Sequence, residues 1–110
     1  METRFLVIED HPSSLELMGC LLRSFGYTPI LASGGEEGCD AARREDPDLI
    51  LCDIYLSDTD GHEIARRHKS DPALRTIPLV AVTALAMVGD RDKVLASGFD
   101  GYMAALKIWV

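Results

Sequence analysis

Short apolar stretches alternate with amphipathic stretches along the whole of this sequence. Five apolar stretches have the length and composition of β-strands, and they lie at residues 4–8, 27–31, 48–53, 77–82 and 101–104. Each of them except the last is followed by a stretch with helical periodicity. Strands that alternate with helices predict parallel pairing, because a parallel connection has to cross back over the sheet. The pattern therefore favours an α/β fold with five parallel strands and four helices.

Serine followed three residues later by glutamate marks two of the expected helix starts. The spacing occurs at Ser13–Glu16 and again at Ser33–Glu36. In such a capping box, each of the two side chains bonds to a backbone N–H group that the first helical turn leaves without a partner. We therefore expect helices to begin at both places, and two further helices at about residues 61–70 and 89–97.

The size and the charge of the chain limit the functions that it can have. At 110 residues and 47% hydrophobic, the chain suits one core, so we expect a single domain over residues 1–110. Eighteen acidic residues against eleven basic ones give a net charge of −7, which disfavours nucleic acid and anionic membranes as partners. No apolar stretch approaches the ~20 residues of a membrane span, and the N-terminus does not read as a signal sequence. We therefore expect a cytoplasmic protein.

The cysteines and histidines show no spacing typical of a metal site. The three cysteines form no C-x-x-C pair, so we interpret Cys20, Cys39 and Cys52 as small residues packed in the core. His11 has no second histidine at ligand spacing, which favours an ordinary loop residue. His68 is expected on the surface of the third helix.

Three acidic residues stand at the carboxyl ends of two expected strands. Glu9 and Asp10 follow the first strand, and Asp53 ends the third. We take the flavodoxin-like strand order 2-1-3-4-5 from known α/β proteins, and in that order these two strands are neighbours. Carboxylates brought together repel one another and raise each other's pKa unless a cation neutralises them. Oxygen ligands of this kind suit Mg²⁺, which binds through one or two carboxylates and phosphate oxygens.

Phosphate chemistry beside such a metal site points to Asp53 as the reactive group. A carboxylate can attack phosphorus to form an acyl phosphate, while a metal offsets the charge on the transferred group. Thr83 ends the fourth expected strand, where its hydroxyl could donate to a phosphoryl oxygen, and the small Ala84 would leave the approach open. The same threonine could instead cap the following turn.

Four motifs are spread along the chain at the ends of these strands. They are Phe-Leu-Val-Ile-Glu-Asp ending at Asp10, Pro-Asp-Leu-Ile-Leu-Cys-Asp ending at Asp53, Val-Ala-Val-Thr-Ala ending at Ala84, and Gly-Phe-Asp-Gly-Tyr ending at Tyr102. Together they resemble the CheY-like receiver domains of bacterial response regulators, and the single-domain members most closely. The resemblance runs from residue 4 to about residue 104. It implies a flavodoxin-like, doubly wound sheet and a role in two-component phosphorelay signal transduction.

The resemblance also implies roles for particular residues. The groups implied for Mg²⁺ binding are the side chains of Glu9, Asp10 and Asp53 and the backbone carbonyl of Tyr55. Asp53 would accept a phosphoryl group from a phosphohistidine on a histidine kinase or a histidine phosphotransfer protein. Thr83 and Ala84 would lie beside that group, and Tyr102 would be the aromatic switch that responds to Thr83. The output would be contact with a downstream protein target, so we expect a signalling module and not an enzyme.

Two features depart from the family's pattern near the end of the chain. The family usually carries Lys-Pro where this chain has Ala105 and Leu106, and the lysine pairs with the phosphoryl group. Lys107 lies roughly 6.6 Å beyond Ala105 on the same strand face at ~3.3 Å per residue, so we expect partial rescue at best. The chain ends at Val110, where the family continues into a fifth helix, so we expect the last helix to be missing and an apolar sheet face to be bare. Such a face favours a homodimer, with exchange of residues 108–110 as one route.

Two other functions are weighed against the phosphoacceptor. Without the lysine and the last helix, the chain could be a degenerate receiver that takes no phosphate and acts as an interaction or dimerisation module. Residues 58–61, Asp-Thr-Asp-Gly, are similar to the nucleophile motif of haloacid-dehalogenase phosphatases. That motif should end a buried apolar strand, whereas here Leu56 and Ser57 precede it. Ser57 also stands where the family commonly has proline, which predicts a slightly looser loop.

Overall fold

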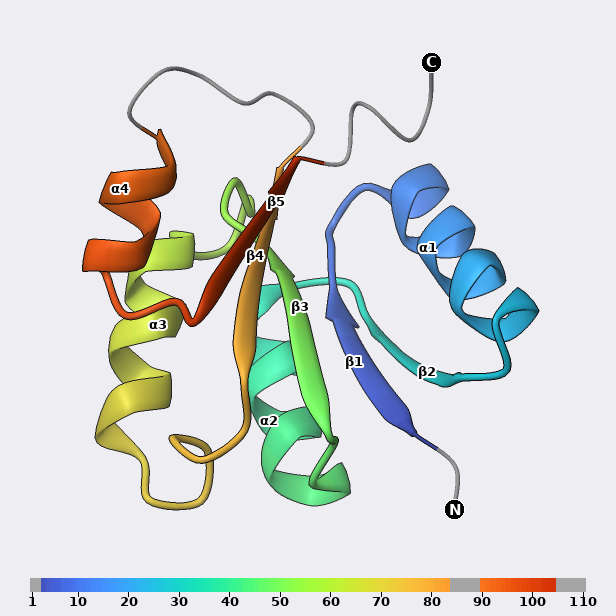
Figure 1. The fold of residues 1–110 in the computed structure, drawn as a ribbon, viewed down its shortest axis with the longest axis horizontal. Helices are drawn as coiled ribbons and strands as arrows, with labels where there is room; N and C mark the ends of the chain where they lie inside the picture. The colour runs from blue at the N-terminus through green and yellow to red at the C-terminus, as the bar shows by residue number, and fades with distance from the viewer. Residues whose placement is uncertain (1–2, 84–89, 105–110) are drawn as a thin grey trace.

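The computed structural model describes residues 3–83 and 90–104, and in these ranges it contains five strands and four helices. In chain order they are β1 Arg4–Ile8, α1 Pro12–Ser24, β2 Thr28–Ala32, α2 Gly35–Glu45, β3 Leu49–Asp53, α3 Gly61–Ser70, β4 Leu79–Thr83, α4 Asp90–Ala96 and β5 Gly101–Ala104. The strands form one parallel sheet in the order β2-β1-β3-β4-β5 (Figure 1). The expected flavodoxin-like α/β fold is therefore confirmed.

The helices cover the two faces of the sheet unequally. Side chains alternate between the faces along a strand, so Phe5 and Ile8 of β1 point to opposite sides. Ile8 shares a small cavity with side chains of α2 and α3, whereas Phe5 shares a groove with Met18 and Leu22 of α1. Thus α1 lies on one face of the sheet, and α2 and α3 lie on the other, with α4 next to α3 (Figure 1).

The core lies between the sheet and the helices α2, α3 and α4. Leu6, Cys52 and Leu79 are completely buried there and come from three adjacent strands. Burying a side chain of the size of leucine stabilises the fold by about 1.5–3 kcal/mol, so a layer of such residues holds the strands in register. The helices contribute Ala41, Ala42, Ile64, Ala65 and Val94 to the same core. This layer fixes where the carboxyl ends of the strands lie.

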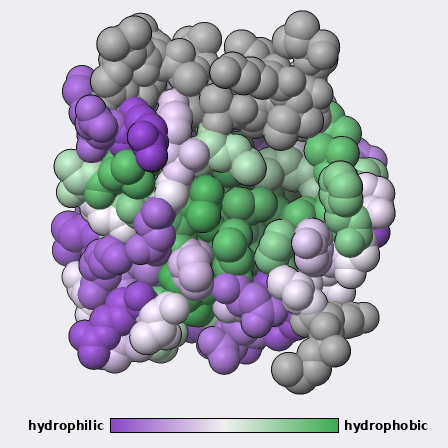
Figure 2. Space-filling view, viewed as in Figure 1, coloured by the Kyte–Doolittle hydropathy of each residue, from purple (hydrophilic) through white to green (hydrophobic). Residues whose placement is uncertain are grey.

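The opposite face of the sheet is covered only in part. A groove of about 560 Å³ runs between α1 and the middle of the sheet. The described residues that line it are all apolar, and they are Phe5, Met18, Leu21, Leu22, Phe25, Leu49, Leu51, Val80, Val82 and Met103. Figure 2 shows this face, with hydrophobic side chains gathered over the centre of the sheet. Strand β5 ends at Ala104, the last described residue, so the expectation of a missing last helix falls on residues 105–110, which lie outside the described part.

Neither of the two capping boxes forms. Helix α1 begins at Pro12, earlier than the predicted start, because the fixed φ of proline suits the first helical position and no N–H is lost there. Its N-cap, His11, makes no side-chain capping bond. At the start of α2, the carboxylate of Asp58 accepts hydrogen bonds from the N–H groups of Gly35 at 2.9 Å and Glu36 at 3.1 Å. A residue distant in the sequence therefore replaces the predicted local cap.

Two predictions about single residues are wrong. His68 is only 2% exposed, because it lies on the buried side of α3, where its Nε2 contacts the carbonyl oxygen of Ile77 at 2.6 Å. Cys20 is exposed, whereas Cys39 and Cys52 are buried as expected. Among the described helices, none is long and apolar enough to cross a membrane.

Candidate functional site

The strand register brings three acidic residues to one edge of the sheet. In the pairing of β1 with β3, Ile8 lies opposite Cys52, so the next residues along the two strands, Glu9 and Asp53, are neighbours. Asp10 follows directly. One carboxylate oxygen from each of the three acids lies within 4.8 Å of the others. The structure therefore brings together the acids that the sequence singled out.

Glu9 is the most strongly perturbed of the three acids. Burial and, after it, a hydrogen bond and the negative charge of Asp53 raise the pKa of Glu9 from its ordinary value of 4.5 to about 8. One of its oxygens, Oε1, accepts the backbone N–H of His11 at 3.1 Å, which opposes this shift in part. At neutral pH and without a cation, Glu9 therefore holds a proton next to Asp53.

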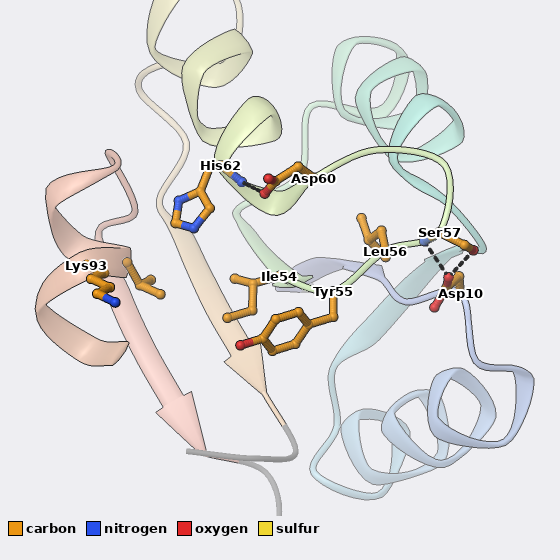
Figure 3. Close-up of a pocket in the computed structure, with 9 residues that line it drawn as sticks. Asp10, Ile54, Tyr55, Leu56, Ser57, Asp60, His62 and Lys93 are labelled. Carbon is orange, nitrogen blue, oxygen red and sulfur yellow. Dashed lines mark hydrogen bonds between the residues drawn. The ribbon is translucent and has the colours of Figure 1, made fainter. Parts of the chain in front are cut away.

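Asp10 is held from the opposite side of the site by the loop between β3 and α3. Its Oδ2 accepts the backbone N–H of Ser57 at 2.7 Å and also the hydroxyl of the same residue (Figure 3). These bonds, the hydroxyl first, keep the pKa of Asp10 below its ordinary value. Proline at position 57 could make neither bond, so the expectation of a looser loop at Ser57 is not supported.

Asp53 ends β3 with its carboxylate only partly buried. Its Oδ1 accepts the backbone N–H of Tyr55 at 3.0 Å. Behind it, Cys52 is fully buried, and burial, followed by the charge of Asp53, raises the pKa of the Cys52 thiol. Cys52 therefore stays a neutral thiol, and Asp53 is the ionisable residue of β3 that is partly exposed. Tyr55 is 62% exposed and lines the same cavity as Asp10.

The loop after Asp53 is anchored at several points. Tyr55 and Asp60 form an isolated bridge, and the N–H of Gly61 donates to the carbonyl of Ile54 at 3.2 Å. Asp60 caps α3 by accepting the N–H of His62 at 2.8 Å. The loop forms one wall of a cavity of about 600 Å³ that reaches from Asp10 to α4 (Figure 3).

The contacts of Asp58 and Asp60 also bear on the phosphatase hypothesis. Asp58 caps α2 and Asp60 caps α3, so each carboxylate accepts backbone N–H groups. Neither residue ends a buried strand, because β3 ends at Asp53. Asp58 and Asp60 therefore do not form a nucleophile and acid pair of the haloacid-dehalogenase type. Their positions after the strand and their capping roles account for the motif.

The other predicted site residues lie on β4 and β5 or beyond them. Val82 is paired with Asp53, so the backbone of Thr83, one residue further along β4, reaches the same edge of the sheet. Ala84 lies outside the described residues. Tyr102 is paired with Ala81 in β5 and packs, half-buried, against the core.

Ser57 and Asp58 are the residues of this site that sequence reasoning missed. Their partners, Asp10 and the start of α2, lie 47 and 22–23 residues away in the chain. Ser57 does carry a sequence signal, because it is a hydrogen-bond donor where proline is common. Asp58 carries none beyond its place in a loop after a strand.

Comparison with known proteins gives one consistent result. The family model described as the response regulator receiver domain matches residues 5–104. The polar-differentiation response regulator DivK of Brucella ovis is 38% identical over 104 residues, which are 94% of this chain and 85% of that protein.

Solved structures agree with this match. The receiver domain of a sensor histidine kinase from Pseudomonas aeruginosa, solved with a magnesium ion coordinated in its active site cleft, has 33% identity and a TM-score of 0.84. That comparison covers 94% of this chain and 85% of the other. A putative response regulator from Chloroflexus aurantiacus has 26% identity and a TM-score of 0.87, with the same coverage of both chains.

Proposed function

Because the chain belongs to the response regulator receiver domain family, we propose that it is an Mg²⁺-dependent phosphoacceptor whose reactive group is Asp53. Receiver domains are the signalling modules of two-component systems, and this chain functions as one of them. The observation that carries the proposal is the convergence of Glu9, Asp10 and Asp53 within 4.8 Å at the end of two parallel strands. Three carboxylates in one place are costly without a cation, so their arrangement supports a metal site.

The donor set suits Mg²⁺. The groups that would hold it are the carboxylates of Glu9, Asp10 and Asp53 and the backbone carbonyl of Tyr55. All are hard oxygen ligands, and no histidine or thiol side chain belongs to the acidic group found among the described residues. When bound, the ion would offset the negative charge on a transferred phosphoryl group. The related Pseudomonas receiver domain, with its coordinated magnesium ion, supports the same choice.

The reaction proposed for Asp53 is the transfer of one phosphoryl group. A carboxylate oxygen of Asp53 attacks phosphorus, an O–P bond forms, and the P–N bond of a phosphohistidine breaks. The electron pair of that bond leaves with the imidazole of the donor, which is a histidine kinase or a histidine phosphotransfer protein. Thr83 would donate its hydroxyl to the phosphoryl oxygens, Ala84 would leave room for them, and Tyr102 would respond as the switch.

We prefer the phosphoacceptor to the degenerate receiver because the acidic site is complete. Ala105 stands where the family has lysine, and this residue and Lys107 lie outside the described part of the chain. The three carboxylates nevertheless meet as a metal site requires. A domain that only mediated contacts would have no need for such a cluster. In our proposal the chain accepts phosphate stoichiometrically and does not turn over phosphate esters.

Intact mass spectrometry tests the proposal directly. The chain is incubated with an acyl phosphate donor such as acetyl phosphate and Mg²⁺, and we expect one added phosphoryl group. Asp53→Asn should abolish it, because the amide is not a nucleophile toward phosphorus. Asp48→Asn is the matched control, since Asp48 lies at the opposite end of β3, where it accepts the N–H of Arg4 at 2.7 Å. Phosphate on the Asp53→Asn chain, or none on the wild type, would overturn the assignment.

For the apolar groove beside α1 we propose a second copy of this chain as the partner. The ten residues that line the groove within the described part of the chain are all apolar, and two copies can meet through the same surface around a twofold axis. Met103 is 44% exposed in that groove, so Met103→Glu should abolish the dimer. Light scattering at rising protein concentration is the measurement, and a strictly monomeric wild type would refute the dimer.

We place the module in the cytoplasm, with a kinase upstream and a protein target downstream.

A further inference from the structure

Ser57, in the loop between β3 and α3, contacts the acidic site through two donors. Its backbone N–H and its hydroxyl both donate to Oδ2 of Asp10, the first at 2.7 Å. The two residues are 47 positions apart in the sequence, and Figure 3 shows both bonds joining the loop to Asp10. Because the hydroxyl of a serine in an exposed loop can bond to water instead, we ask what this double contact with Asp10 does for the site.

The contact leaves one oxygen of Asp10 for a cation. An ionised carboxylate has two oxygens with about four lone-pair positions in total. Both Ser57 donors go to Oδ2, and Oδ1 is then the oxygen that can bind a metal without breaking either bond. The two donors also restrain Oδ2, which limits the rotation of the carboxylate.

Ser57 is itself held in place independently of Asp10. The next residue, Asp58, has its carboxylate bonded to the N–H groups of Gly35 and Glu36 at the start of α2. Beyond it, Asp60 caps α3. The residues that follow Ser57 are therefore tied to two helices by bonds that do not involve Asp10.

We propose that Ser57 is a positioning residue that holds Asp10 ready to bind Mg²⁺ through its Oδ1. The inference rests on the proposed function, because it assumes that the acidic site takes the ion. Side chains that hydrogen-bond to metal ligands typically contribute tenfold to a hundredfold to metal affinity. Replacement of the hydroxyl leaves the backbone N–H bond in place, so we expect the loss of Mg²⁺ affinity to lie at the lower end of this range, at about tenfold.

Three single variants of the whole chain separate positioning from simple stability. Ser57→Ala removes the hydroxyl, and Ser57→Thr restores it on a slightly larger side chain. Ser24→Ala is the matched control, because Ser24 ends α1, about 18 Å along the helix from its start, and donates to the carbonyl of Leu21. For each chain, calorimetric titration with MgCl₂ gives the dissociation constant, and thermal unfolding without metal gives the stability.

We expect Ser57→Ala to bind Mg²⁺ about tenfold more weakly than the wild type. Ser57→Thr should bind within about twofold of the wild type, and Ser24→Ala should match it, as expected for an outer-shell bond that threonine preserves. A Ser57→Ala chain that loses stability without metal but keeps its Mg²⁺ affinity would show that the hydroxyl only stabilises the loop, which overturns the proposal. Failure of threonine to restore the affinity would also overturn it. A wild type that binds no Mg²⁺ overturns this inference together with the proposed function, whereas wild-type binding with an unchanged Ser57→Ala constant overturns the inference alone.

Discussion

The proton on Glu9 should make the proposed Mg²⁺ binding depend on pH in a range where ordinary carboxylates do not titrate. Burial, followed by the hydrogen bond and charge of Asp53, raises the pKa of Glu9 from 4.5 to about 8. A metal ligand has to be ionised, so an ion that enters the site displaces this proton. The perturbation is therefore the pH of the titration, combined with the variant Glu9→Gln, whose amide holds no titrating proton.

The expected size of the effect follows from this shift. Well below the pKa of Glu9, each unit of pH raises the ionised fraction about tenfold, and the Mg²⁺ affinity rises with it. Between about pH 6 and pH 8 this gives at most roughly a fiftyfold gain. Because Glu9 is only partly buried and water screens its interaction with Asp53, we expect about tenfold to fiftyfold.

The metal-free stability should follow the opposite trend. The folded-state pKa of Glu9 lies above its unfolded value, so its stabilising contribution is complete below about pH 4.5 and is lost as the pH rises through about 8. Without metal, the folded chain should thus be less stable at the alkaline end of this window. Saturating Mg²⁺ should reverse the trend, because a ligand that binds only the folded state stabilises it.

Calorimetric titration of the wild type with MgCl₂ in matched buffers across this window is the assay. Glu9→Gln should bind weakly with a dissociation constant that hardly changes with pH. Glu16→Gln, on the exposed side of α1, serves as the control and should retain the wild-type profile. A wild-type constant that varies less than about twofold over the window would refute the reasoning, since a carboxyl with an ordinary pKa would give that flat profile.

Two further changes test how the loop after β3 is built. Gly61→Ala should destabilise the chain by about 1–3 kcal/mol in urea unfolding, because its Cβ would lie 2.6 Å from the backbone Cα of Ile54. Gly101→Ala, whose Cβ would meet only ordinary side-chain contacts, is the control, and an equal loss in both variants would contradict the steric argument. Asp58→Ala should cost about 1 kcal/mol, since it removes the acceptor for two N–H groups at the start of α2. Asp92→Ala, on the exposed side of α4, should leave the unfolding midpoint unchanged, and the capping role fails if the two aspartate variants behave alike.

Patterns that repeat within a few residues predicted the fold well. The alternation of strands and helices placed α3 and the last strand at their observed bounds, and the other strands to within two residues. The acids Glu9 and Asp53 could be placed together because a parallel register brings the carboxyl ends of neighbouring strands to one edge. His68 could have been placed correctly as well. It follows the buried residues Ile64 and Ala65 at helical spacing, so the periodicity of α3 already assigned it to the core side.

Contacts between distant residues were beyond the reach of the same reasoning. A capping box is a local motif, and the predicted box at the start of α2 does not cap it, because Asp58, 23 residues from Gly35, supplies the acceptor. The bonds from Ser57 to Asp10 cross a still longer interval. Such bonds depend on how two loops meet after the sheet has formed. Sequence reasoning could therefore place the three acids together but could not identify the residues that hydrogen-bond to them.

Backbone N–H groups hold the carboxylates of the acidic site. This matters for the effect of Ala105, which stands where the family usually has lysine. Each acid accepts one backbone N–H: from His11 to Glu9, from Ser57 to Asp10, and from Tyr55 to Asp53. These bonds position the carboxylates without any basic side chain. The family's lysine pairs with the phosphoryl group, so alanine in its place should affect the phosphorylated state and leave Mg²⁺ binding intact. A chain that binds Mg²⁺ but takes up no phosphoryl group would then be a receiver domain that keeps its metal site and has lost phosphoryl transfer to Asp53.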